Sequence, residues 1–344
     1  MTYIPPAFAP FEPAFAAQLR AKVDGKAKPP GSLGRIEALA VQIGLVQQTE
    51  APDIDRIEAY VFAGDHGLNE EGVSAYPSAV TAAMVATFLA GRASVNALAR
   101  ACDVGVVVVD AGVDADIAPH PALIDAKLRR GSRNAAREAA LTEAEVEQAL
   151  RRGAEIAAGS KAEALVIGEM GIGNSASAAL LMHRLAPAPL ADCIGAGAGH
   201  DAEGLARKAS VLARAAARSD AALPIEVLRQ FGGLEIAMMA GAFLGGAANR
   251  KLMIVDGFIS SAAALVAVRL APNLSERLVF AHASAERGHR ALLAAVGAAP
   301  LLDLDMRLGE GSGGVLAAPL VRAAARLMTE TASLDDVLAG RIVP

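Results

Sequence analysis

The chain has 344 residues, of which 53% are hydrophobic and only 3% aromatic, and its formal net charge is −5 at pH 7. This length allows a large hydrophobic core, either in one domain or in one domain with a smaller lobe. The acidic balance, without a dense Lys/Arg cluster interleaved with aromatic residues, excludes a typical nucleic-acid surface, so no nucleic acid is expected as a partner.

The positive mean hydropathy of +0.37 raises the question of a membrane span. No uncharged stretch reaches the ~18–20 residues that a spanning helix needs. The N-terminal residues 1–6 lack the basic and apolar regions of a signal peptide. The two cysteines, Cys102 and Cys193, lie beside apolar runs without metal-binding spacing, which is typical of reduced thiols. We therefore expect a soluble, cytoplasmic protein that makes no membrane contact.

Helical sequence fills about the first 45 residues, apart from a break at the Pro-Pro-Gly of residues 29–31. Short apolar runs then alternate with long Ala-rich helical stretches, and residues 127–152 read as a charged surface loop and helix. Nearly continuous apolar runs are typical of strands buried on both faces of a parallel sheet. The predicted fold class is therefore α/β, a parallel sheet flanked by helices. The predicted strands are residues 57–63, 104–109, 164–167, 252–255 and 277–281.

Most of these strands lead directly into polar residues. Parallel α/β sheets place ligand-binding groups at the carboxyl ends of their strands. We therefore expect these residues to converge on one crevice. They are Asp65, His66, Asp110, Glu169, Asp256 and His282.

The loop of residues 168–177 follows a strand and opens a helix. Amides at a helix N-terminus bind anions, and Gly171 and Gly173 allow close approach, while Asn174 and Ser175 add polar side chains. The loop matches neither the Walker A motif nor G-x-S-x-G, where Ser177 stands in place of glycine. The loop predicts a phosphate site; the alternative is a tight strand–helix turn capped by Ser175.

A second glycine loop spans residues 195–200 and includes Gly197 and Gly199. It fails the dinucleotide pattern, because His200 takes the last glycine position. The following helix carries Arg207 and Lys208. A cation there can meet a phosphate or a nicotinate carboxylate, or it can belong to a solvated helix face.

His282, Glu286 and His289 have the spacing of three metal ligands on one helix face. However, Ser284 reads as the N-cap of that helix, which places His282 on the strand end. Without a further ligand cluster we expect no metal site.

The segment Arg307-Leu-Gly-Glu-Gly-Ser-Gly313 holds one acid, Glu310, between two glycines. Residues 299–306 before it predict a strand or an extended entry, and residues 315–328 after it predict a helix. The absence of a Cβ at Gly309 and Gly311 lets the backbone approach a ligand closely. A lone acid on such a loop is well placed to act as a general base; the alternative is a carboxylate that caps the helix or meets water.

Together with Lys28–Arg35, Glu70–Pro77, Phe231–Ile236 and His282–His289, these loops resemble the nicotinate-nucleotide:5,6-dimethylbenzimidazole phosphoribosyltransferase family, in the family's order, from about residue 28 to about residue 330. The resemblance implies a Rossmann-like large domain over residues 46–315 and a small helical lobe built from residues 1–45 and 316–344. It also implies a homodimer, and neither a metal nor a redox cofactor. The family commonly has two threonines after the Asn, where this chain has Ser175 and Ala176, so one hydroxyl contact is in doubt.

The implied reaction transfers the 5-phosphoribosyl group of β-nicotinate mononucleotide to a benzimidazole-type base, with inversion at C1′, and releases nicotinate. Glu310 would accept the proton of the base, and Glu169 would assist or orient it. An apolar slot with one polar group at its edge suits an aromatic base, although its residues could equally be core. The candidate substrate-binding residues are Tyr76, Met84, Met170, Gly171, Gly173, Asn174, Ser175, Gly197, Gly199, Lys208, Asp256, Leu308, Gly311, Ser312 and Gly313.

Two alternatives come from other classes. A phosphoribosyltransferase that uses phosphoribosyl pyrophosphate usually has two adjacent acids and a Thr-Gly-rich phosphate loop, whereas the strand here ends in Asp256 alone. A non-catalytic nucleotide- or azole-binding protein would keep the glycine loops without needing Glu310. Which base is used in the cell is left open by the sequence.

Overall fold

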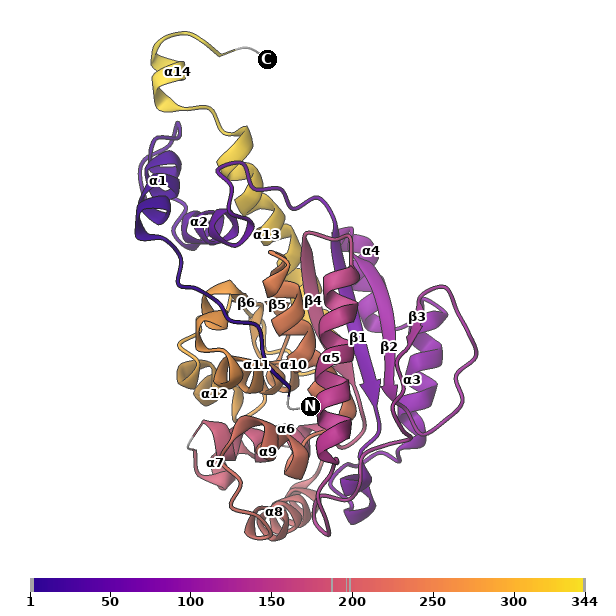
Figure 1. Cartoon of the computed structure of the whole chain (residues 1–344). Helices are drawn as coiled ribbons and strands as arrows, with labels where there is room; N and C mark the ends of the chain where they lie inside the picture. The colour runs from indigo at the N-terminus through magenta and orange to yellow at the C-terminus, as the bar shows by residue number, and fades with distance from the viewer. Residues whose placement is uncertain (1–2, 187, 196, 198, 343–344) are drawn as a thin grey trace.

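The computed structural model describes residues 3–186, 188–195, 197 and 199–342, and is built on one six-stranded sheet (Figure 1). All five predicted strands are present, and a short sixth strand, β3, was not predicted. Every pair of neighbours is parallel, in the order β3-β2-β1-β4-β5-β6. The strands are β1 (Ile57–Gly64), β2 (Gly105–Gly112), β3 (Leu123–Asp125), β4 (Ala164–Met170), β5 (Leu252–Val255) and β6 (Leu278–Phe280).

Both faces of the sheet are covered, which explains why the strands are apolar at almost every position. Along β1, Tyr60 and Phe62 point into one core, whereas Val61 and Ala63 point into the other, as the two-residue period of a strand requires. The first core is completed by α5 (Glu143–Gly159), α6 (Asn174–Leu185), α9 (Pro224–Phe231), α10 (Leu234–Ala248) and α11 (Phe258–Leu270). The second is completed by α3 (Ala79–Leu89), α4 (Ser94–Cys102) and α13 (Ser312–Glu330), together with α1 and α2 of the small lobe.

Glycines allow α5 and α10 to pack backbone against backbone (Figure 1). A Cβ at Gly153 would lie only 1.9 Å from the carbonyl oxygen of Met238, and one at Gly241 would lie 2.0 Å from that of Leu150. Because no side chain fits there, these glycines permit the contact that closes the first core.

The strand order reverses at β1, whose neighbours are β2 on one side and β4 on the other. In doubly wound sheets, a crevice forms outside the carboxyl ends of the strands at this reversal. The loops after β1 and β4 carry Asp65, His66 and the glycine loop that begins at Gly168.

The small lobe gathers helices from both ends of the sequence, whereas residues 3–12 run from it to the large domain, where the Tyr3 amide donates to Glu147 at 3.0 Å (Figure 1). It contains α1 (Pro13–Asp24), α2 (Arg35–Gln47), the distal half of α13 and α14 (Leu334–Leu338). Lys26 Nζ donates to the carbonyl oxygen of Thr331 at 2.7 Å and so ties the N-terminal part to the end of α13. The division expected between residues 315 and 316 falls inside α13, so one continuous helix runs from the glycine loop of Glu310 into the lobe.

The predicted extended segment before Glu310 contains β8, which pairs with β7 in a separate two-stranded sheet. His282 lies on β7, as predicted. Ser284 is not an N-cap, because the next helix begins only at His289, after Gly288. The other elements are η1 (Gly67–Glu71), α7 (Leu190–Cys193), α8 (Ala202–Ala217), η2 (Pro272–Arg277), β7 (His282–Ala283), α12 (His289–Ala295) and β8 (Leu302–Asp303).

The segment Ala79–Cys102 is, by length and composition alone, apolar enough to cross a membrane. The structure breaks it at residues 90–93 into α3 and α4, which have 11 and 9 residues. Each is shorter than the roughly 20 residues that a spanning helix requires.

Candidate active site

A cavity of about 450 Å³ opens at the carboxyl ends of β4, β5 and β6. It brings together the two candidate carboxylates, most of the first glycine loop and the four predicted apolar residues. The predicted residues that line it are Tyr76, Met84, Glu169, Met170, Gly171, Gly173, Asn174, Ser175, Gly197, Leu308 and Glu310.

Six candidate substrate-binding residues do not line this cavity: Gly199, Lys208, Asp256, Gly311, Ser312 and Gly313. Asp110 also stays outside it, because its carboxylate pairs with Lys127 Nζ at 3.1 Å. Several other residues of the cavity wall were not predicted to contact substrate. Gly257 and Phe258 could have been predicted, because they directly follow the predicted strand end at Asp256. The added wall residues are Ser74, Val80, Ile172, Gly257, Phe258, Ile259, His282, Ser284, Glu286, Arg307 and Gly309.

Glu310 projects from a turn at the start of α13 and is only 5% exposed. Its φ of 63° is in the left-handed region, which is costly for a residue with a side chain. Its Oε2 accepts a hydrogen bond from the amide of Val95, in the first turn of α4, at 3.3 Å. Burial raises the pKa of Glu310, which brings this carboxylate closer to the range of an effective general base.

Glu169, near the end of β4, faces the same cavity and is also buried. Its Oε2 accepts a hydrogen bond from the side-chain amide of Asn174. Burial raises the pKa of Glu169 to about 8, and the negative charges of Asp256, Glu235 and Glu310 add to the effect. Near neutral pH Glu169 therefore holds a proton that it can donate.

The first glycine loop ends at Gly173, the N-cap of α6, with a φ of 94°. No side chain caps this helix, so the alternative of a turn capped by Ser175 is wrong. Instead, Ser175 Oγ accepts a hydrogen bond from Lys208 Nζ at 2.9 Å. The amides of Asn174 and Ala176 already donate to the carbonyl oxygens of Gly171 and Gly173, both at 3.1 Å, so an anion at this helix N-terminus would meet the amide of Ser175 and the positive end of the helix dipole.

Lys208 is fully buried, in contrast to its exposed neighbour Arg207. Its ammonium also donates to the carbonyl oxygen of Gly195 at 3.0 Å. A Cβ at Gly197 would lie 3.4 Å from Lys208 Nζ, so the cation lies directly behind a glycine of the cavity wall. Burial lowers the pKa of Lys208 to about 8. Of the two cations that the sequence could not separate, Lys208 is the one next to the glycine loops.

The buried pair of His66 and Glu235 packs against the first glycine loop and α6. His66 Nε2 lies 2.6 Å from Glu235 Oε1, and His66 Nδ1 lies 2.9 Å from the hydroxyl of Ser177 in α6. Burial acts to lower the pKa of His66, but the carboxylates of Glu235 and Asp65 raise it, and the net shift is upward. The pair therefore orders the loop and does not line the cavity.

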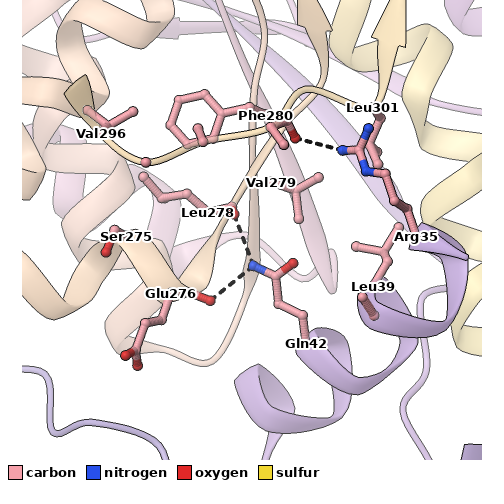
Figure 2. Close-up of a pocket in the computed structure, with 14 residues that line it drawn as sticks. Arg35, Leu39, Gln42, Ser275, Glu276, Leu278, Val279, Phe280, Val296 and Leu301 are labelled. Carbon is pink, nitrogen blue, oxygen red and sulfur yellow. Dashed lines mark hydrogen bonds between the residues drawn. The ribbon is translucent and has the colours of Figure 1, made fainter. Parts of the chain in front are cut away.

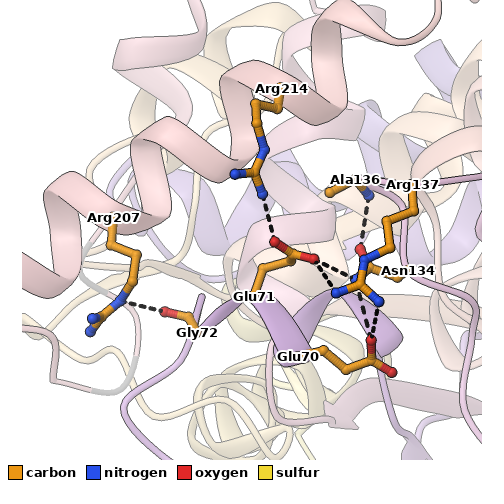
Figure 3. Close-up of polar contacts among 8 residues, drawn as sticks. All are labelled: Glu70, Glu71, Gly72, Asn134, Ala136, Arg137, Arg207 and Arg214. Carbon is orange, nitrogen blue, oxygen red and sulfur yellow. Dashed lines mark hydrogen bonds and ion pairs between the residues drawn. The ribbon is translucent and has the colours of Figure 1, made fainter.

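The apolar wall includes Tyr76 and Leu308, which are 48% and 54% exposed and stand at the mouth of the cavity. The segment before Tyr76 is held by an ion-pair network, shown in Figure 3. Glu71 pairs with Arg137 at 2.8 Å and with Arg214 of α8 at 2.6 Å. A single exposed ion pair contributes little to stability, but a network of several charges holds a loop in place more effectively.

His289, one of the three residues with metal-ligand spacing, is engaged within the fold. His289 Nδ1 accepts the amide of Ser284 at 2.7 Å, and its Nε2 lies 2.9 Å from Ser261 Oγ, so both ring nitrogens are engaged. Burial lowers the pKa of His289 to about 3, which keeps the ring neutral. Within the described part of the chain, no three His, Cys, Asp or Glu residues are placed to hold a metal ion.

A second cavity, of about 380 Å³, lies between α2 and the edge strand β6 (Figure 2). Gln42 donates to the carbonyl oxygens of Glu276 and Leu278, both at 3.0 Å. Arg35 donates to the carbonyl oxygens of Ala299 and Pro300 at 2.7 and 2.6 Å. These polar groups fasten the small lobe to the sheet edge, and the cavity shares no residue with the one around Glu310.

A doubly wound sheet whose crevice holds two buried acids, a glycine loop at a helix N-terminus and an apolar wall is compatible with a transferase that acts on a sugar phosphate. The model of a family described as phosphoribosyltransferase matches residues 8–337. The chain is 55% identical over 329 residues to the nicotinate-nucleotide–dimethylbenzimidazole phosphoribosyltransferase of Ralstonia nicotianae, covering 94% of this chain and 93% of the relative. The chain therefore belongs to the nicotinate-nucleotide–dimethylbenzimidazole phosphoribosyltransferase family.

Other relatives agree. The enzyme of the same name from Cupriavidus necator is 50% identical over 334 residues, which cover 96% of each chain. The crystal structure of CobT from Thermus thermophilus is similar with a TM-score of 0.91 at 42% identity, covering 94% of this chain and 98% of that one. The α/β fold predicted from the sequence is thus confirmed.

Proposed function

We propose that this protein transfers the 5-phosphoribosyl group of β-nicotinate mononucleotide to 5,6-dimethylbenzimidazole or a related base. One ring nitrogen of the base forms a bond to C1′, the bond from C1′ to the nicotinate nitrogen breaks, and nicotinate leaves. Attack from the opposite face converts a β-nucleotide into an α-ribazole 5′-phosphate. The observation that carries the proposal is the presence of Glu310, the N-terminus of α6 and an apolar slot around one cavity.

Glu310 is the general base of this mechanism. When one nitrogen of the base bonds to C1′, the N–H on the other nitrogen becomes acidic and must be removed. The Glu310 carboxylate faces the cavity and is buried, so it is desolvated and close to its target. Nicotinate departs as a neutral pyridine ring from a cationic N-glycosidic bond, and its departure therefore needs little acid catalysis.

Glu169 has the second role. Since its pKa lies near 8, it is protonated at neutral pH and can donate a hydrogen bond. Its carboxyl is fixed by Asn174, on the first turn of the phosphate helix. Glu169 thereby orients substrate or base without competing for the proton that Glu310 accepts.

The 5′-phosphate binds at the N-terminus of α6. Asn174 and Ser175 line the cavity, and the ammonium of the buried Lys208 donates to the Ser175 hydroxyl at 2.9 Å. These groups anchor the sugar remote from C1′ and so contribute to catalysis by positioning. The base stacks in the slot lined by Tyr76, Met84 and Leu308.

We further propose that the enzyme acts in the cytoplasm as a homodimer and needs neither a nucleic acid nor a membrane. The lobe carries exposed apolar side chains suited to self-association: Leu334, Val337, Leu338 and Ile342. Sedimentation equilibrium tests the homodimer, and a mass of one chain at micromolar concentration would reject it.

Mass spectrometry of reaction products tests the main proposal. The protein is incubated with nicotinate mononucleotide and a panel of bases that includes dimethylbenzimidazole, benzimidazole, adenine and a phenol. We expect free nicotinate and one ribotide of the preferred base in equal amounts. Binding of both ligands without any ribotide would instead support the non-catalytic alternative, and activity only with phosphoribosyl pyrophosphate would support the other transferase class.

A further inference from the structure

Asp256 was expected to bind substrate, but both oxygens of its carboxylate are used by the protein itself. Its Oδ1 accepts the amide of Gly314 at 2.9 Å, and its Oδ2 accepts the amide of Gly311 at 3.1 Å. Asp256 lies at the end of β5, is 2% exposed and does not line the cavity. It therefore caps α13 from another part of the chain, because no side chain of the helix itself does so.

The turn held by this carboxylate has an uncommon backbone. Gly309, Glu310 and Gly311 are all left-handed, with φ values of 89°, 63° and 85°. For Glu310, which carries a Cβ, this conformation is strained and persists only when its surroundings impose it. Three backbone hydrogen bonds also hold the turn: the amides of Glu310, Ser312 and Val315 donate to the carbonyl oxygens of Glu169, Gly309 and Gly311 at 3.2, 3.0 and 2.9 Å. In addition, the side chain of Asp256 accepts hydrogen bonds from the backbone amides of Gly311 and Gly314, just after Glu310.

We propose that Asp256 is a positioning residue for the general base: its carboxylate fixes the left-handed turn that points Glu310 into the cavity. This inference rests on the proposed role of Glu310 and adds how that side chain is placed. A free Glu310 loop would spread the carboxylate over many orientations, and misplacement by about 1 Å is enough to slow a reaction roughly 10²-fold. Asp256 itself touches neither the cavity nor a reacting atom, so it acts only through Glu310.

The charge of Asp256 also acts on Glu310. Burial is the main reason why the pKa of Glu310 is raised, and the nearby Asp256 raises it further, while the Val95 amide lowers it. Burial raises the pKa of Asp256 itself, whereas the nearby His282 and the amides that its two oxygens accept favour the ionised form. The charged and titratable groups around this turn are Glu169 at the end of β4, Asp256 at the end of β5, His282 on β7, and Glu286 and Arg307 on the cavity wall.

The test compares Asp256→Asn with the wild type, with Asp303→Asn, an exposed carboxylate on β8, as the matched control. Asn keeps the size of the side chain, but its NH₂ group cannot accept one of the two amides. We expect kcat to fall by roughly 10- to 100-fold while both KM values stay within about two-fold. The acid limb of the kcat–pH profile should move to lower pH, because the neighbouring negative charge is lost.

If Asp256 had a purely structural role, Asp256→Asn would lower the melting temperature without moving the acid limb of the kcat–pH profile. That result would overturn the inference. If Asp256→Asn does not fold, Ser260→Ala examines the same placement, because the Ser260 hydroxyl accepts the Asp256 amide at 3.3 Å. There we expect a smaller loss of kcat at unchanged KM, and a wild-type kcat would reject the inference. Wild-type turnover in Glu310→Gln would instead reject the role of Glu310 itself, so the two failures are distinguishable.

Discussion

The amide of Glu310 donates to the carbonyl oxygen of Glu169 at 3.2 Å, which joins two acidic loops that are 141 residues apart in the chain. The contact places both carboxylates in one cavity, yet their surroundings differ. Both are buried, but Glu169 accepts a hydrogen bond from the side-chain amide of Asn174, whereas Glu310 accepts one from the backbone amide of Val95. Burial raises the pKa of both carboxyls, that of Glu169 to about 8, so Glu169 can donate a proton near neutral pH.

Replacing Glu310 with Gln should lower kcat by roughly 10²–10⁴-fold, the usual range for a lost general base. Gln keeps the side-chain shape, so the melting temperature and substrate affinities should change little. Steady-state kinetics of the purified variant provide the measurement. Glu330→Gln, an exposed carboxylate at the other end of α13, is the control. Near-normal turnover in Glu310→Gln would remove this residue from the mechanism.

Replacing Lys208 with Met should reduce kcat/KM for nicotinate mononucleotide by roughly 10- to 100-fold, since a charge-assisted hydrogen bond contributes about 1.5–3 kcal/mol. The nucleoside without its phosphate should be a poor substrate for the wild type, and the variant should treat it no worse. Lys161→Met is the control, because this exposed lysine precedes the amino end of β4, whereas the cavity lies at the carboxyl end. An equal loss on nucleotide and nucleoside would mean that Lys208 supports the fold and not the phosphate.

Gly173→Val should produce a similar defect on the full nucleotide. The φ of 94° suits glycine, and an added Cβ would lie 3.3 Å from the Cβ of Asn69, so the loop must shift away from the phosphate. Activity assays on nucleotide and nucleoside should show that the loss largely disappears when the phosphate is absent. The same substitution at Gly159, where an added Cβ meets nothing within 4 Å, should leave activity unchanged. Equal efficiency for nucleoside and nucleotide in the wild type would reduce this loop to a structural turn.

Glu169 should make stability depend on pH. Its pKa is raised from 4.5 to about 8 in the folded state, so the folded protein holds a proton that the unfolded chain releases. The stabilisation is fully present below about pH 4.5 and is lost as the pH rises through about 8. Thermal unfolding of the ligand-free protein should therefore show a falling melting temperature over this window, and Glu169→Gln should flatten that fall. An identical slope in the variant would contradict the assigned protonation state.

Activity should survive exhaustive chelation. The cationic glycosidic bond of the substrate already activates its leaving group, and His289 uses both of its ring nitrogens within the fold. Product formation is measured after dialysis against EDTA and after adding back divalent ions. Activity lost with EDTA and restored by one particular ion would bring His282, Glu286 and His289 back into consideration as ligands.

Some elements could be predicted because their physical cause is local. The run Leu252–Val255 is apolar at every position since both faces of β5 are covered, and the predicted and observed bounds coincide. Glu310 could be chosen as a candidate base because glycines flank it, and such a loop permits close approach to a ligand. Strand β3 (Leu123–Asp125) was not predicted, because a run of only two apolar residues and one aspartate is too short to show a periodic pattern.

Ser284 was predicted to be the N-cap of a helix, and this prediction was wrong because of a tertiary contact. Its amide is taken by the Nδ1 atom of His289, and the chain turns once more before α12 begins. A sequence window shows a good capping residue but not the imidazole that bonds to its backbone. Similarly, the turn at Glu310 has no local cap, because the carboxylate that caps α13 comes from Asp256, more than 50 residues earlier.

The sequence by itself determined the fold class, the glycine loops and the single acid on the Glu310 turn, because burial, backbone freedom and residue chemistry leave local marks. Only the tertiary structure decided what each polar residue contacts. Arg207 and Lys208 are adjacent and alike in the sequence, but successive residues of a helix point about 100° apart. That rotation leaves Arg207 in solvent and buries Lys208 against Ser175, and contacts of this kind depend on which segments the fold brings together.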